Sequence, residues 1–146
     1  MVEPYKIQLR GFHNTCDESG NIIGFQFEVR SKYYKGLWLS QMRVGDVTVD
    51  GVVYDRDTVI WNINGMDYTR QEMFDRQDVY WQLNDTAIIK IQKPGGLEKG
   101  YHEVFVAFGW VSNYNGAKEK EYDGSGLGNA GTSTPERDMR RMLLAR

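Results

Sequence analysis

Apolar and polar residues alternate along most of the first 111 residues, which is the pattern of half-buried β-strands. In residues 24–30, Phe25, Phe27 and Val29 share one face, and the residues between them are polar. Runs of the same kind predict further strands at residues 46–51, 52–54, 58–63, 79–83, 86–92 and 101–111.

Turn residues separate these runs. Asp50-Gly51 and Asn64-Gly65 tolerate positive φ and predict two tight hairpin turns. Pro94-Gly95-Gly96 predicts a third turn, before the last strand of this region. About eight short strands with frequent turns indicate an all-β fold, an antiparallel β-sandwich, rather than a fold of alternating strands and helices.

One segment within this region predicts a short helix. In residues 68–76, Thr69 is followed three residues later by Glu72, which is the spacing of a capping box. Met73 and Phe74 supply an apolar side. We therefore expect a single short helix between two strands.

The character of the chain changes after Val111. Residues 112–133 are polar and glycine-rich without any period, which is typical of a linker or an extended arm. Thr134 then predicts the N-cap of a short amphipathic helix, with an apolar stripe of Met139, Met142 and Leu143. A helix this short is marginal alone in water, so we expect it to dock on another surface.

Composition supports one domain with a tail. The length of 146 residues suits a single core, so we expect a β-sandwich domain at residues 1–112 and a polar arm with its short helix at 113–146. The net charge of −2 gives no general attraction to nucleic acid or to an anionic membrane. A single cysteine, Cys16, and the lack of a signal peptide or an apolar run of membrane-spanning length predict a cytoplasmic protein.

No motif predicts an active site in this chain. Residues 126–131 match G-x-G-x-x-G, but a charged coil precedes them and the next predicted helix starts too late to bind a pyrophosphate. His13, Cys16 and Asp17 could supply three metal ligands, but the stretch around them reads better as a hairpin loop. We expect no catalytic, cofactor-binding or metal-binding residue here.

Large aromatic residues exceed what one small sandwich needs. The strand at 101–111 is apolar on both faces, so it lies either between two layers or against a partner. We expect residues 33–42 to form the centre of a partner interface, with Gly36 as an exposed bend beside Trp38. The alternative is a large core with a few exposed rings. The expected interface residues are Tyr33, Tyr34, Trp38, Trp81, Trp110, Met139, Met142 and Leu143.

Several segments together resemble a known family over residues 10–108. They are "GFHN", "IIGFQFEVRSKYYKGLWLSQM", "VTVDGVVYDRDTVIWNINGMDYTRQEM" and "KPGGLEKGYHEVFV". In this order they resemble the small β subunit of bacterial C-glycoside deglycosidases. Residues 112–146 lie outside the resemblance.

The resemblance implies a non-catalytic β subunit of a heteromeric enzyme. Its α subunit is expected to be a TIM barrel similar to sugar isomerases and to hold a divalent metal, with manganese as the expected ion. The complex would cleave the carbon–carbon bond between a 3-oxo sugar and a flavonoid-type aglycone by a lyase-like elimination.

Two other functions stay open at this point. One is a carbohydrate- or aglycone-binding sandwich that uses Trp38, Trp81 or Trp110 as a stacking platform. The other is a free-standing metal enzyme built on His13, Cys16 and Asp17. Neither the aglycone nor the stoichiometry of the complex follows from the sequence.

Overall fold

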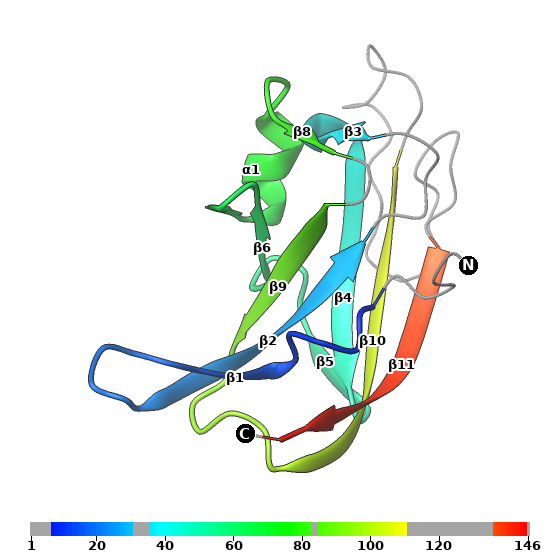
Figure 1. The fold of residues 1–146 in the computed structure, drawn as a ribbon. Helices are drawn as coiled ribbons and strands as arrows, with labels where there is room; N and C mark the ends of the chain where they lie inside the picture. Colours follow the sequence, from blue (N-terminus) through cyan, green and yellow to red (C-terminus); the bar gives the residue numbers. More distant parts are fainter. Residues whose placement is uncertain (1–6, 31–35, 83–84, 111–135, 146) are drawn as a thin grey trace.

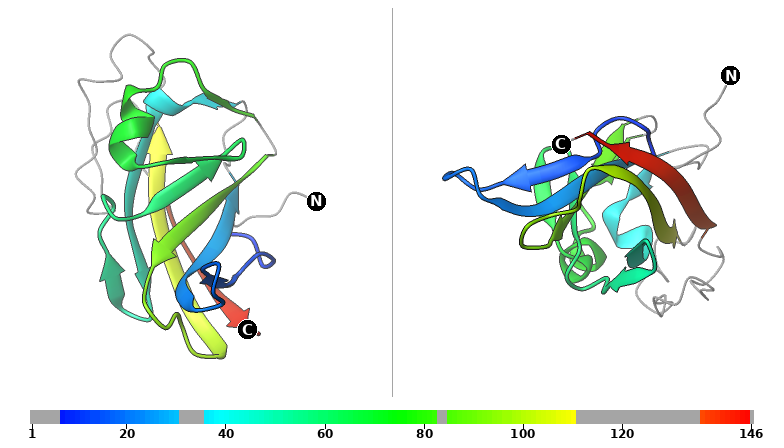
Figure 2. Two further views of the ribbon diagram at one scale, coloured as in Figure 1. Left: turned by 90° about the vertical axis from the view of Figure 1, so that its left-hand side faces the viewer. Right: turned by 90° about the horizontal axis from the view of Figure 1, so that it is seen from below.

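Two antiparallel β-sheets pack face to face in this protein. The computed structural model describes residues 7–30, 36–82, 85–110 and 136–145, and Figure 1 shows one sheet in front of the other. Two further views show the same two layers from the side and from below (Figure 2). The predicted antiparallel β-sandwich is confirmed.

The first sheet has five strands in the order β1-β2-β9-β6-β7. Their bounds are β1 His13–Cys16, β2 Ile22–Arg30, β9 Thr86–Gln92, β6 Ile60–Ile63 and β7 Met66–Tyr68. All neighbouring strands in it are antiparallel.

The second sheet has four strands in the order β11-β10-β4-β5. Their bounds are β11 Glu136–Leu144, β10 Gly100–Trp110, β4 Met42–Val49 and β5 Val52–Tyr54. The remaining elements are the two-stranded pair β3 Leu37–Trp38 and β8 Tyr80–Trp81, the 3-10 helix η1 Leu39–Gln41 and the helix α1 Arg70–Asp75.

The core lies between the two sheets. Every second residue of β2 points inward, so Phe25, Phe27 and Val29 are fully buried, as the alternation predicted. Three rings fill the middle: the Trp61 ring centroid lies 5.2 Å from that of Phe108 and 6.3 Å from that of Trp81. These edge-on contacts are a favourable geometry for aromatic pairs.

The predicted turns and the predicted first helix are confirmed. Asp50 and Gly51 have φ of 50° and 83°, and Asn64 and Gly65 have φ of 57° and 84°, as two-residue hairpin turns require. Helix α1 begins after Thr69, whose side chain accepts a hydrogen bond from the Glu72 backbone N–H; the Glu72 side chain accepts one from Thr69 N–H in return.

The predicted C-terminal helix is wrong, because residues 136–144 form strand β11. This strand pairs antiparallel with β10 from Phe108 opposite Glu136 to Gly100 opposite Leu144. The apolar stripe is therefore divided between two faces: Met142 is buried, while Met139 and Leu143 are exposed. A short isolated helix has little stability of its own in water. As a strand, the segment pairs with the backbone N–H and C=O groups at the edge of β10 and buries Met142 and Leu144.

The C-terminal segment thus belongs to the sandwich. The glycine-rich arm expected at residues 112–133, with its G-x-G-x-x-G match, lies outside the described residues, and the domain boundary near residue 112 stays a prediction.

Candidate functional site: two outer faces of the sandwich

The four-stranded sheet has an apolar outer face. Successive residues of a strand point to opposite sides, so the outward positions of β10 and β11 are those between the buried ones. Tyr101, Met139 and Leu143 are 62%, 56% and 54% exposed, and Val53 on β5 is 62% exposed. We call this surface the apolar face, although it includes one charged pair, and define it by Thr48, Val53, Tyr101, Glu103, Phe105, Met139, Arg141 and Leu143.

The register of the sheet brings these side chains together. Tyr101 lies opposite Leu143, and a row runs across all four strands from Met139 through Phe105 and Thr48 to Val53. Arg141 lies with its guanidinium carbon 4.6 Å from the centre of the Tyr101 ring, within the range of a cation–π contact.

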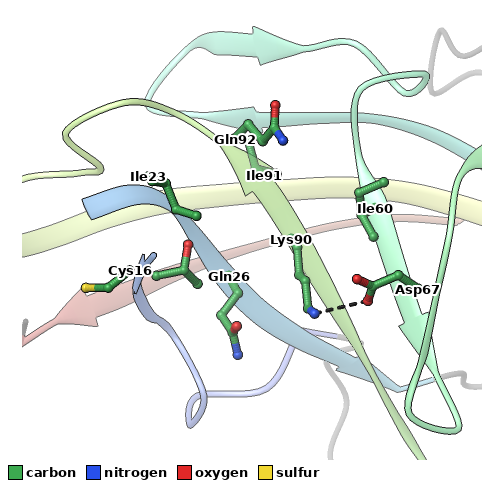
Figure 3. Close-up of a pocket in the computed structure, with 9 residues that line it drawn as sticks. Cys16, Ile23, Gln26, Ile60, Asp67, Lys90, Ile91 and Gln92 are labelled. Atoms are coloured by element: carbon green, nitrogen blue, oxygen red, sulfur yellow. Dashed lines mark hydrogen bonds and ion pairs between the residues drawn. The ribbon is translucent and has the colours of Figure 1, made fainter. Parts of the chain in front are cut away.

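The five-stranded sheet has a polar outer face with a hollow in it. Figure 3 shows the hollow, which has a volume of about 440 Å³ and lies over β1, β2, β9, β6 and β7. One cross-strand row of this face runs from His13 through Gln26 and Lys90 to Ile60. We call this surface the polar face.

An ion pair stands at one side of the hollow. The Lys90 ammonium donates a hydrogen bond to the Asp67 carboxylate at 3.0 Å, and the Asn62 amide donates to the same oxygen at 2.8 Å. The Asn62 hydrogen bond, together with Lys90, lowers the pKa of Asp67. The hollow therefore offers a carboxylate, an ammonium group and the amides of Gln26 and Gln92 beside isoleucine side chains.

His102 joins the β4–β5 turn to β10. Its Nδ1 lies 2.6 Å from the Asp50 carboxylate, and its Nε2 lies 2.7 Å from the Glu98 carbonyl oxygen. Both partners only accept, so the ring satisfies both when both nitrogens carry a proton. Burial lowers the pKa of His102, but the hydrogen bonds to Glu98 and Asp50 and the charge of Asp50 outweigh burial and raise it overall.

Of the three residues considered for a metal site, His13 and Cys16 lie in β1 and Asp17 shapes the β1–β2 turn. Asp17 accepts hydrogen bonds from the backbone N–H groups of Ser19 and Asn21, and the bond from Asn21 is the main cause of its lowered pKa. The His13 Nδ1 lies 2.8 Å from the Asn14 carbonyl oxygen, and Cys16 is exposed. Within the described ranges no three His, Cys, Asp or Glu side chains group in a way that fits a metal ion.

The expected centre of the interface is more buried than predicted. Gly36 is buried instead of being an exposed bend: a Cβ there would lie 2.5 Å from the Tyr80 ring and 2.6 Å from the Trp81 carbonyl oxygen. Trp38 is half-buried, with its ring centroid 5.0 Å from that of Tyr80. The described part of this segment, residues 36–42, thus packs on β8, and among these residues all but the half-buried Trp38 are buried.

The predicted interface residues separate into three groups. Trp81 and Met142 are 1% exposed and belong to the core of this chain, so neither offers a surface to a partner. Met139 and Leu143 lie on the apolar face, and Trp38 is half-buried. Tyr33 and Tyr34 lie outside the described residues, and Trp110 is described only as the last residue of strand β10.

Sequence reasoning missed two features of this structure. Val53 and Tyr101 are each 62% exposed but were not among the expected surface residues, although the two-sided apolar pattern of 101–111 was a signal for Tyr101. The buried Arg43 was also missed: it donates to the carbonyl oxygens of Ser40 and Met42 at 2.8 and 2.9 Å, and burial lowers its pKa to about 10. Its guanidinium lies 4.9 Å from the Phe74 ring centre and so attaches helix α1 to β4.

None of the helices in the described part of the chain has the length and apolar character that crossing a membrane requires.

Comparison with known proteins adds a family. A family model described as C-glycoside deglycosidase beta subunit matches residues 2–114, which include β1 to β10 but not β11. A C-glycoside deglycosidase beta subunit of Eubacterium cellulosolvens is 42% identical over 113 residues, which cover 77% of this chain and 77% of the relative.

Two further relatives are more distant. A C-glycoside deglycosidase beta subunit of Arthrobacter globiformis is 32% identical over 79 residues, covering 54% of this chain and 60% of the relative. A 3'-dehydrocarminate deglycosidase beta subunit of Microbacterium is 34% identical over 90 residues, covering 61% of this chain and 64% of the relative.

Proposed function

Because this chain belongs to the C-glycoside deglycosidase beta subunit family, we propose that it is the non-catalytic subunit of a two-component C-glycoside deglycosidase. Its partner is an α subunit with a TIM barrel that resembles sugar isomerases. That subunit would hold a divalent metal, which we expect to be manganese. Several copies of each subunit could assemble into one complex. The metal supplies polarisation of the sugar carbonyl when bound.

The substrate class of the proposal is a 3-oxo-C-glycoside with a flavonoid-type aglycone. A base of the α subunit removes the proton next to the 3-keto group, and the carbon–carbon bond then breaks as the aglycone carbon takes up a proton. An unsaturated keto sugar remains, which makes the reaction a lyase-type elimination. This chain supports that subunit. The proposed setting is the cytoplasm, where the exposed Cys16 thiol would remain reduced.

The observation that carries the proposal is the family match over residues 2–114, which spans ten of the strands. The local chemistry agrees with a supporting role. The Asp17 carboxylate shapes a turn, both ring nitrogens of His102 are hydrogen-bonded within the chain, and the Asp67 carboxylate is paired with Lys90. These groups are engaged in structure rather than poised for proton transfer.

Co-expression tests the proposal. The full chain and the α subunit from the same genome should purify as one complex that releases the aglycone from a 3-oxo-C-glycoside, measured by chromatography. The isolated chain should release none, and a chelator should abolish the activity of the complex. Aglycone release by the isolated chain, or an α subunit that works at full rate and never binds this chain, contradicts the proposal.

The hollow of the polar face favours a second candidate function, a carbohydrate- or aglycone-binding module. Its volume of about 440 Å³ is in the range of small-molecule sites, and its amides and ion pair could bond sugar hydroxyls. Titration of the isolated chain with a C-glycoside tests it: saturable binding that Lys90→Ala abolishes supports this role, and no binding at millimolar ligand excludes it.

A further inference from the structure

We propose that the apolar face is the surface on which the α subunit docks. The inference rests on the proposed function, since it takes the α subunit as the partner, and it adds the place of contact. It assigns the contact to β5, β4, β10 and β11 and leaves the polar face of the other sheet outside the interface.

The first step of the argument is the exposure of large apolar side chains. An antiparallel sheet with one face on the core normally carries polar residues on the other face, which meets water. Here Tyr101, Met139 and Leu143 are each more than half exposed on adjacent strands. Isolated exposed apolar residues are ordinary, but a contiguous group of them marks an interaction surface.

The second step is the chemistry of the group. Tyr and Arg are enriched among the residues that dominate binding energy at protein interfaces. Tyr101 and Arg141 already lie against each other at 4.6 Å, so little side-chain freedom remains to be lost on binding. Leu143 lies directly across from Tyr101, and Met139 lies one outward position from Arg141 on the same strand.

The third step is size. Strands lie about 4.8 Å apart and rise about 3.4 Å per residue, so this sheet, whose strands β10, β11, β4 and β5 have 11, 9, 8 and 3 residues, presents roughly 500 Å² in projection. Side-chain relief and the adjoining turns add to that area. A stable complex buries about 800 Å² on each partner, so this face would supply the larger part of such an interface and the adjoining turns the rest.

The fourth step is the contrast with the other sheet. The outward positions of β2, β9, β6 and β7 include Glu28, Asn62, Asp67 and Lys90, and both Asn62 and Lys90 donate a hydrogen bond to Asp67. Docking on that face would remove charged groups from water, which costs free energy. The contacts that these groups make with one another limit that cost but do not remove it. On the apolar face one pair of charged residues, Glu103 opposite Arg141, lies between the apolar pairs Tyr101–Leu143 and Phe105–Met139, so docking there buries apolar side chains on both sides of that pair.

Substitution on matched methionines tests the proposal. Met139 on the apolar face and Met66 on the five-stranded sheet are 56% and 59% exposed. Met139→Asp should weaken the Kd for the α subunit by at least about tenfold, because it replaces an apolar side chain in the contact with a carboxylate that must lose its water. Met66→Asp should change it by less than about threefold. Affinity is measured by titrating the full chain into the α subunit, and circular dichroism checks that each variant folds.

A second variant guards against a folding defect at Met139. Tyr101→Ala removes the ring from a position that is 62% exposed and should also weaken binding by at least about tenfold while the isolated chain stays folded.

The outcomes separate the two proposals. If the wild-type chain never binds the α subunit, the proposed function fails. If the wild type binds and Met139→Asp and Tyr101→Ala bind equally well, the docking surface is overturned and the function stands. If light scattering shows that the isolated chain dimerises, and Met139→Asp makes it monomeric while α binding is unchanged, the face pairs two copies of this chain and the inference is overturned.

Discussion

The two outer faces of the sandwich are built from the same kind of strand but differ in their balance of apolar and polar side chains. On the five-stranded sheet the outward positions include Gln26, Asn62 and Lys90, and an ion pair borders the hollow. On the four-stranded sheet they include Tyr101 and Met139, which are more than half exposed. Alternation puts apolar residues inward in both sheets, so only the outward half of the pattern distinguishes the two outer faces.

The two faces also differ in their origin along the chain. The polar face is built by strands within residues 13–92. The apolar face needs β11, which follows β10 only after a long interval of sequence and supplies Met139, Arg141 and Leu143. The nine residues of β11 thus complete a surface that β10, β4 and β5 only begin.

The largest expected effect concerns β11 itself. Met142→Ala should lower the free energy of unfolding by about 2–4 kcal/mol, because the side chain is buried and its loss leaves a cavity. Leu143→Ala, on the next residue and outward, should change it by less than about 0.5 kcal/mol. Chemical denaturation of the isolated chain measures both. Equal losses at Met139, Met142 and Leu143 would instead support a helix with one apolar stripe.

Charge reversal on each face gives the next effect. Arg141→Glu should weaken the Kd for the α subunit by about tenfold or more, because the guanidinium stacks on Tyr101 within the proposed contact. Lys90→Glu on the polar face should change it by less than about threefold. A larger loss from Lys90→Glu than from Arg141→Glu would move the interface to the other sheet.

The stability of the β4–β5 turn beside the apolar face should depend on pH through His102. The pKa of His102 is raised in the folded protein, so its contribution to the free energy of unfolding is complete below the ordinary histidine pKa of about 6.5. That contribution is lost as the pH rises through the pKa of the folded state. The lowered pKa of Asp50 acts in the other direction, because its contribution is lost as the pH falls through the folded value.

His102→Gln provides the measurement. The wild type should exceed this variant in free energy of unfolding by on the order of 1 kcal/mol at about pH 5.5, and by less at about pH 9. If the difference in free energy of unfolding between the wild type and this variant stays constant across this pH range, the protonated His102 ring is not what stabilises the contacts with Asp50 and Glu98.

The smallest effect is expected from the ion pair on the polar face. Asp67→Asn should change the free energy of unfolding by less than about 1 kcal/mol, because Asp67 and Lys90 are both partly exposed. The difference should shrink further as salt is added. A loss of several kcal/mol would mean that this face is structural rather than merely solvated.

Local chemistry allowed much of the fold to be predicted from the sequence. The alternation in residues 24–30, the turns at Asp50-Gly51 and Asn64-Gly65 and the capping box at Thr69 all reappear in the structure. Each depends on residues within a few positions of one another, where backbone preferences and side-chain hydrogen bonds act directly. The resemblance to the beta subunit family was carried by these same segments.

Tertiary structure decided the faces and the C-terminus. Met139, Met142 and Leu143 fit one helical stripe as well as two sides of a strand, and only the open edge of β10 favours the strand. Trp81 was expected at a surface and lies in the core, because the rings of Trp61 and Phe108 meet it there. Sequence period fixes which residues share a side, but what covers that side depends on strands that meet across long distances in the chain.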